Sequence, residues 1–160
     1  MGYGFSARGF VVVWPIFLFF SVLNGDYVEL GLLTSVLFFF SFISTIVIGK
    51  KFDKHNKNFV GGVLTFSGVV WLLKLFVIVP IFAYFADFLH GLVKPAHEIT
   101  VDGVTYENAA PHIMDYILYR EFFIHFGIIV YSGLLILIPN LYLGMFIASL
   151  GSFMMVLLQK

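Results

Sequence analysis

Several ionisable residues of this chain stand inside apolar segments, and these are the positions at which the sequence could do chemistry. They are Lys74, Asp87, His90, Asp115, Arg120, Glu121 and His125. A charge within a membrane span costs on the order of a few kcal/mol and normally faces a protein interior or a water-filled cavity. We expect five of them to bind a solute or a coupling ion: Asp87, His90, Arg120, Glu121 and His125.

The depths of these residues predict which of them meet. A helix rises about 1.5 Å per residue, so Asp87 lies about 10 Å from Lys94, and Arg120 and Glu121 lie about 12 and 13 Å from the start of the next apolar segment. Because the depths match, we expect Asp87 to neutralise Arg120 if the two segments are neighbours. Glu121 would then pair with His125 at i,i+4, or titrate alone as suits a proton-coupled carrier. The alternative is a buried polar clasp of the same residues with no transport role.

The composition identifies the solvent that surrounds these segments. The chain has 160 residues, of which 61% are hydrophobic and 11% charged, against roughly 45–50% apolar and about 25% charged in soluble domains. Its mean hydropathy is +1.01. Only a lipid bilayer accommodates so much hydrocarbon surface, so the sequence predicts an integral membrane protein. A formal charge of zero gives no basic surplus for nucleic acid, which we exclude as a partner.

Cofactor and enzyme chemistry find little support in the residue types. The chain has no cysteine, which excludes disulfides, thiolate metal sites and iron–sulfur clusters. His90 and His125 could face each other as haem ligands, but b-type bundles usually need further intramembrane histidines that this chain lacks. No Gly-x-Ser-x-Gly elbow occurs. We therefore expect no metal, no cofactor and no enzymatic activity.

The apolar segments predict an all-α membrane protein with six transmembrane helices in a single domain, residues 1–160. With about 20 residues per span as the ruler, the spans are residues 9–23, 28–48, 59–78, 80–94, 112–137 and 141–158. The turns at Val79-Pro80 and Pro139-Asn140 are very short, which predicts two antiparallel helical hairpins.

The positive charges predict the orientation of the chain, because Lys and Arg stay on the cytoplasmic side. One side of the six-span arrangement collects Arg8, Lys50, Lys51, Lys54, Lys57, Lys94 and Lys160. The opposite turns carry none, and Lys74 is the one exception. We expect a multi-pass protein of the plasma (inner) membrane with both termini in the cytoplasm.

A polar segment follows the fourth predicted span. Its run from Ile99 to Tyr106 places β-branched residues on both sides of Asp102-Gly103, which is a strong hairpin signal. We expect a small cytoplasmic β-hairpin over residues 99–106, acting either as a simple connector or as a gate.

The polar turn after the second span carries a pattern of its own, with Gly49, Asp53, Lys54 and Lys57 at fixed spacing. It resembles the loop between the second and third helices in each half of the major facilitator superfamily, Gly-x-Leu-x-Asp-Arg-x-Gly-Arg-Arg. The match is partial, because Lys51, Asn56 and Asn58 replace the apolar residue, the second glycine and the final base. By resemblance, the four matching residues form a latch that holds the cytoplasmic side closed in the outward-facing state. The alternative is a merely basic cytoplasmic turn.

The resemblance also implies a fold and an activity. Members of the family have twelve spans in two six-helix halves around a central cavity, and this chain corresponds to one half. Asp87 stands where first halves often have the arginine of Arg-x-x-Gln-Gly, so the chain looks more like a second half; Gly91 matches the glycine.

The activity implied is that of a secondary transporter. It would move a small solute by alternating access, with proton coupling, in the lipid bilayer and against a second six-helix half, either in the same longer chain or in a second copy. The alternative is a non-transporting membrane scaffold or assembly subunit.

Overall fold

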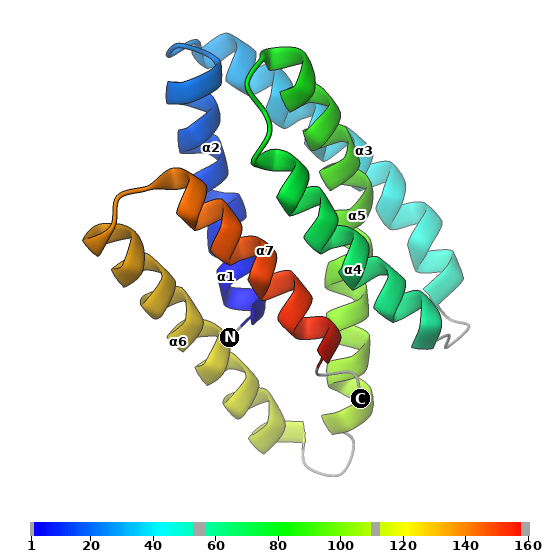
Figure 1. Cartoon of the computed structure of the whole chain (residues 1–160). Helices are drawn as coiled ribbons and strands as arrows, with labels where there is room; N and C mark the ends of the chain where they lie inside the picture. Colours follow the sequence, from blue (N-terminus) through cyan, green and yellow to red (C-terminus); the bar gives the residue numbers. More distant parts are fainter. Residues whose placement is uncertain (1, 53–56, 110–112, 158–160) are drawn as a thin grey trace.

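The computed structural model describes residues 2–52, 57–109 and 113–157, and every regular element in these ranges is a helix. The first helix covers Gly2–Val22 and is divided into α1 (Gly2–Arg8), η1 (Gly9–Val13), α2 (Trp14–Phe17) and η2 (Leu18–Val22). The others are α3 (Tyr27–Phe52), α4 (Lys57–Lys74), α5 (Pro80–Ala109), α6 (Ile113–Leu137) and α7 (Leu141–Leu157), as Figure 1 shows. The all-α class predicted from the sequence is confirmed for these residues.

The first helix, called the N-terminal helix below, is not a regular α-helix. Its segments η1 and η2 are π-helical turns on either side of α2, which has Pro15 in its first turn. A proline inside a helix lacks an N–H donor and crowds the preceding turn, and a wider π turn relieves this conflict. The helix ends where Asn24 and Gly25 take positive φ angles of 50° and 88°, which suit these two residue types.

The other turns also follow their local chemistry. Asp26 Oδ1 accepts hydrogen bonds from the backbone N–H groups of Val28 and Glu29 and so caps α3. Asn140 Oδ1 caps α7 in the same way, and Pro80 stands at the first position of α5, where a missing N–H costs nothing. The short turn predicted at Pro139-Asn140 is confirmed, whereas the turn before Pro80 is longer than predicted, because α4 ends at Lys74.

The six helices of the described residues pack in a defined set of pairs. The most extensive contacts join α3 with α5, α4 with α7, α4 with α5, and the N-terminal helix with both α6 and α7. The same set of pairs results when each of the first three helices is exchanged with the helix three places further along the chain. The pair of α3 with α5 then becomes the pair of α6 with the N-terminal helix. The pair of α4 with α5 becomes the pair of α7 with the N-terminal helix. The bundle thus pairs its helices as a repeat of two three-helix units (Figure 1).

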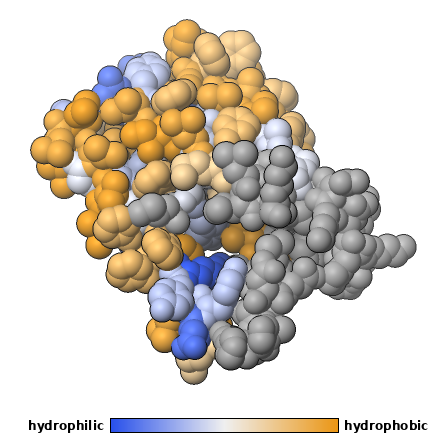
Figure 2. Space-filling view, turned by 60° about the horizontal axis from the view of Figure 1, so that its bottom comes forward, coloured by the Kyte–Doolittle hydropathy of each residue, from blue (hydrophilic) through white to orange (hydrophobic). Residues whose placement is uncertain are grey.

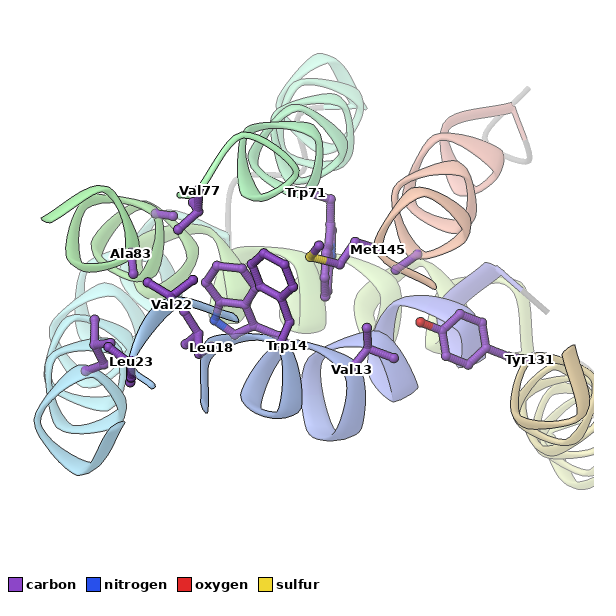
Figure 3. Close-up of a cluster of buried hydrophobic side chains, with 14 residues drawn as sticks. Val13, Trp14, Leu18, Val22, Leu23, Trp71, Val77, Ala83, Tyr131 and Met145 are labelled. Atoms are coloured by element: carbon purple, nitrogen blue, oxygen red, sulfur yellow. The ribbon is translucent and has the colours of Figure 1, made fainter. Parts of the chain in front are cut away.

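The core lies where the N-terminal helix meets α4, α5 and α7. Trp14, Trp71 and Met145 are buried there, and Figure 3 shows Tyr131 reaching from α6 toward the N-terminal helix. The Tyr131 hydroxyl donates a hydrogen bond to the carbonyl of Gly144, at 2.9 Å. These contacts join residues far apart in the chain, so the core ties most of the helices together.

The β-hairpin predicted over residues 99–106 is wrong. Helix α5 continues from Pro80 through Pro95 to Ala109, well beyond the predicted end of the fourth span at residue 94. Ala96 and His97 are buried, and the His97 ring contacts Tyr3 with 6.0 Å between ring centres. Packing of this second half of α5 against the N-terminal helix and α4 therefore outweighs the local Asp-Gly turn signal.

The count of six spans is not supported by helix length and composition. Three described helices are long and apolar enough to cross a membrane, within Gly2–Val22, Tyr27–Gly49 and Met114–Leu137. The apolar stretches of α4 and α7, Gly61–Lys74 and Leu141–Met155, are shorter. Helix α5 is long, but it carries several ionisable residues. The three helices are consistent with a membrane protein.

The outer surface agrees with that class. Most side chains of α3 and α6 within their apolar stretches are exposed, among them Phe38, Phe39, Phe42, Phe122 and Ile129. Figure 2 shows apolar residues over much of one face, with hydrophilic residues gathered around a hollow. Exposed apolar area on this scale is what a lipid-facing surface requires, since soluble monomers rarely expose such large apolar patches.

Candidate functional site: a buried ion pair and a polar cavity

A fully buried ion pair lies at the centre of the bundle. The Nζ of Lys74 is 3.3 Å from Oδ1 of Asp87, and the two side chains are 0% and 3% exposed. The indole Nε1 of Trp14 donates a hydrogen bond to the same oxygen, at 2.7 Å. Two charges taken out of water are tolerated when they are paired and hydrogen-bonded, which is the arrangement here.

Aromatic rings enclose the cation. Lys74 Nζ is 4.0 Å from the ring centre of Trp14, 5.0 Å from that of Trp71 and 5.8 Å from that of Phe10. An ammonium over the face of an aromatic ring is stabilised by about 2 kcal/mol or more when desolvated. The carboxylate and these rings come from three helices, so the ion pair fastens the N-terminal helix, α4 and α5 to one another.

The local fold explains why these residues meet. Helix α4 ends at Lys74, and the short turn before Pro80 sends α5 back beside it. Asp87 stands two turns into α5, on the side that faces α4 and the N-terminal helix. Trp14 comes from the middle of the N-terminal helix, next to the π turn that precedes Pro15.

The predicted pairing of Asp87 with Arg120 is wrong. Arg120 instead forms ion pairs with Asp102 on α5 and, at 3.3 Å, with its neighbour Glu121. Helices α5 and α6 contact each other little, whereas α6 packs on the N-terminal helix, where a Cβ on Gly4 would lie 2.4 Å from the carbonyl oxygen of Ile124. The predicted equal depth is also wrong, because Asp102 stands 15 residues after Asp87 on α5, which is about 22 Å along the helix at 1.5 Å per residue.

Glu121 and His125 lie close together, as their i,i+4 spacing predicts. His125 Nδ1 is 3.9 Å from Glu121 Oε2 and donates a hydrogen bond to the Glu121 backbone carbonyl at 2.8 Å. Their side chains are 46% and 69% exposed, although both lie within a helix long and apolar enough to span a membrane. Asp115, in the first turn of the same helix, is also exposed.

His90 belongs to the interior. It stands one turn after Asp87 on α5, where its ring stacks on Phe10 with 5.0 Å between ring centres and meets Trp71 edge-on at 5.5 Å. Two turns further, His97 Nδ1 is 2.9 Å from the hydroxyl of Ser67, and His97 Nε2 is buried without a hydrogen-bond partner among the described residues.

These histidines line a cavity of about 170 Å³ between the N-terminal helix, α4 and α5. Its walls include Phe10, Trp71, His90, Lys94, His97 and Glu98. Lys94 and Glu98 are partly exposed and form an i,i+4 ion pair at 3.4 Å. The cavity thus combines an aromatic wall with one cation, one anion and two imidazoles.

Sequence reasoning missed three features of this site. Lys74 was recognised as an intramembrane charge but was not assigned a partner, and Trp14 carried no signal of its hydrogen bond. His97 was missed because the fourth span was ended at residue 94. The spacing of residues 87, 90, 94 and 97 along one helix face was the available signal, once α5 is allowed to continue.

The latch residues stay a prediction. Asp53 and Lys54 lie outside the described residues, and Lys57 begins α4. Gly49 is exposed near the end of α3, and a Cβ added there would have no described neighbour within 4 Å. The described chain therefore does not need a glycine at this position for close helix packing.

Within the described residues, no group of three His, Asp or Glu side chains is placed to hold a metal ion. Comparisons of the chain with family models, with curated proteins and with solved structures gave no match.

Proposed function

We propose that this chain is one six-helix half of a secondary transporter of the major facilitator type, which moves a small solute by alternating access. The observation that carries the proposal is the helix pairing, which repeats when the first three helices are exchanged for the last three. Each half of such transporters consists of two three-helix repeats of inverted topology. An odd number of helices per repeat inverts the second copy, provided all six helices cross the bilayer.

The crossing of all six helices is part of the proposal. Helix α5 has 30 residues, about 45 Å at 1.5 Å per residue, which exceeds a hydrocarbon core of about 30 Å. Its charge at Asp87 is turned inward and neutralised by Lys74, so this charge does not prevent insertion. Helices α4 and α7 are shorter, but they pack against each other in the bundle.

The exposed ionisable groups of α6 support a water-filled cavity. The side chains of Glu121 and His125 are 46% and 69% exposed within a candidate span, and such groups are costly in hydrocarbon. A second six-helix half, from a longer chain or a second copy, would close a cavity over this surface. Glu121 would then face water and substrate, as a coupling residue of the carrier does.

The test is reconstitution of the full chain in liposomes that contain a pH-sensitive dye. Amino acids, sugars and carboxylic acids are added separately under an imposed proton gradient. We expect one of these classes to drive proton entry, and Glu121→Gln to reduce that entry at least tenfold. Glu29→Gln, the same chemical change in the first turn of α3, is the matched control. Normal coupled uptake by Glu121→Gln would remove Glu121 from the coupling site.

A non-transporting scaffold is the second candidate, and the burial of the Lys74–Asp87 pair favours it. A pair whose side chains are 0% and 3% exposed serves helix assembly without any solute. Because the chain has no cysteine, single cysteines introduced on α6 can be cross-linked in native membranes. Cross-links to a second half support the carrier, whereas a stable monomer with no partner and no solute-driven flux supports the scaffold.

A further inference from the structure

The cavity between the N-terminal helix, α4 and α5 has the size of a small-molecule site. Its volume is about 170 Å³, and an engineered apolar cavity of about 150 Å³ in another protein binds benzene. A ligand of six to eight non-hydrogen atoms is therefore the appropriate scale. Phe10 and Trp71 supply an apolar wall for part of such a ligand.

The charged groups of the cavity come as one cation and one anion. Lys94 Nζ lies 3.4 Å from Glu98 Oε1 and 5.2 Å from the ring centre of Phe10. Charge-assisted hydrogen bonds normally measure about 2.7–2.9 Å, so this ion pair is loose. A ligand that brings both charges can enter between the two side chains and leave each of them with a partner.

Histidines supply further polar contacts deeper in the wall. The ring of His90 is held by Phe10 and Trp71. His97 is fixed through Nδ1 by the hydroxyl of Ser67 and also lines the cavity. His97 Nε2 is buried without a hydrogen-bond partner among the described residues, and such a group is costly, so a polar ligand group beside His97 would be stabilising.

Charge balance selects the ligand class. A simple cation would leave Lys94 competing with it for Glu98, and a simple anion would leave Glu98 competing with it for Lys94. We infer that the cavity binds a zwitterion, a small α-amino acid with an apolar side chain, whose carboxylate meets Lys94 and whose ammonium meets Glu98. The side chain of the amino acid lies against Phe10 and Trp71. This inference names the solute of the carrier and rests on the proposed function.

The test measures binding alone, with radiolabelled L-valine and the purified full chain in nanodiscs. Unlabelled L-valine competes with the label, as do isovalerate, which lacks the amine, and isobutylamine, which lacks the carboxylate. We expect each analogue to compete at least tenfold more weakly than L-valine, as the loss of a charged hydrogen bond predicts. Saturable binding for which isovalerate and isobutylamine compete as well as L-valine overturns the inference, and so does an absence of saturable binding.

Two variants assign the charges. Glu98→Gln removes the preference for L-valine over isovalerate, and Lys94→Gln removes the preference over isobutylamine, while helical content stays unchanged in both. Glu29→Gln keeps both preferences as the matched control. If both variants keep the preference of the unaltered protein for L-valine over isovalerate and isobutylamine, the assignment of the charges is wrong. Valine binding without transport contradicts the carrier alone, whereas transport of another solute class without valine binding contradicts this inference alone.

Discussion

Removing one charge of the Lys74–Asp87 pair should destabilise the protein far more than removing both. In Asp87→Asn the amide oxygen can still accept the hydrogen bond of Trp14 Nε1, so the variant removes the negative charge and keeps that contact. It leaves Lys74 wholly buried with only aromatic rings around its ammonium. In Lys74→Met the carboxylate of Asp87 stays buried without its cation, and Trp14 Nε1 is then its one hydrogen-bond donor among the described residues.

The size of the expected loss of stability follows from the burial of the Lys74–Asp87 pair. Breaking a buried ion pair by removing one partner costs about 3–5 kcal/mol, whereas replacing the whole pair by groups of similar volume is often near neutral. We expect each single variant to lose about 3–5 kcal/mol of unfolding free energy and Lys74→Met/Asp87→Asn to lose about 1–2 kcal/mol. At roughly 2–4 °C per kcal/mol, the single variants melt about 6–20 °C lower.

The assay is thermal unfolding in detergent, followed by tryptophan fluorescence and by helical circular dichroism. The chain has two tryptophans, and both lie within 5.0 Å of Lys74 Nζ, measured to their ring centres. Their emission therefore reports on the ion pair itself. Single variants within about 1 kcal/mol of the unaltered protein, or a double variant that loses the sum of the two, would refute the reasoning.

Two further predictions concern helix packing and the exposed charges. Gly91→Ala places a Cβ 2.6 Å from the carbonyl oxygen of Leu37 on α3, so it should lower the free energy of unfolding by about 1–3 kcal/mol. The Cβ of Gly133→Ala meets nothing within 4 Å, so this variant should raise the free energy of unfolding by up to about 1 kcal/mol. Thermal unfolding compares the two variants, and equal effects would contradict the packing. Asp102→Asn breaks the pair with Arg120, in which the side chains of Arg120 and Asp102 are 24% and 52% exposed. It should change the free energy of unfolding by less than about 1 kcal/mol in the same assay. A loss as large as that of Asp87→Asn would contradict the assigned burial.

The helix boundaries near residues 22–27, 80 and 140 were predictable because the chemistry that sets them is local. Asn24 and Gly25 take the left-handed backbone that ends a helix, and Asp26 and Asn140 cap the helices that follow. Pro80 needs no partner for a missing N–H at the first position of α5. Each signal spans a few residues and requires no knowledge of the rest of the fold.

The failures depended on contacts between distant parts of the chain. Asp102-Gly103 is a turn signal on its own, but packing of the second half of α5 decided its structure. Counting residues from the predicted span ends placed Asp87 and Arg120 at equal depth, but α5 continues past residue 94, and Arg120 pairs with Asp102, 15 residues after Asp87. The partner of Asp87 could be found only after the neighbours of α5 were known.

Water accessibility on α6 tests the carrier most directly. Single cysteines at positions 121 and 125, introduced into the naturally cysteine-free chain, are exposed to a membrane-impermeant thiol reagent in native membranes. The same change at Phe39 of α3 and Phe146 of α7, both exposed apolar positions, gives the lipid-facing controls. We predict labelling at positions 121 and 125 and none at the controls. Protection of all four positions would contradict a water-filled cavity between two six-helix halves.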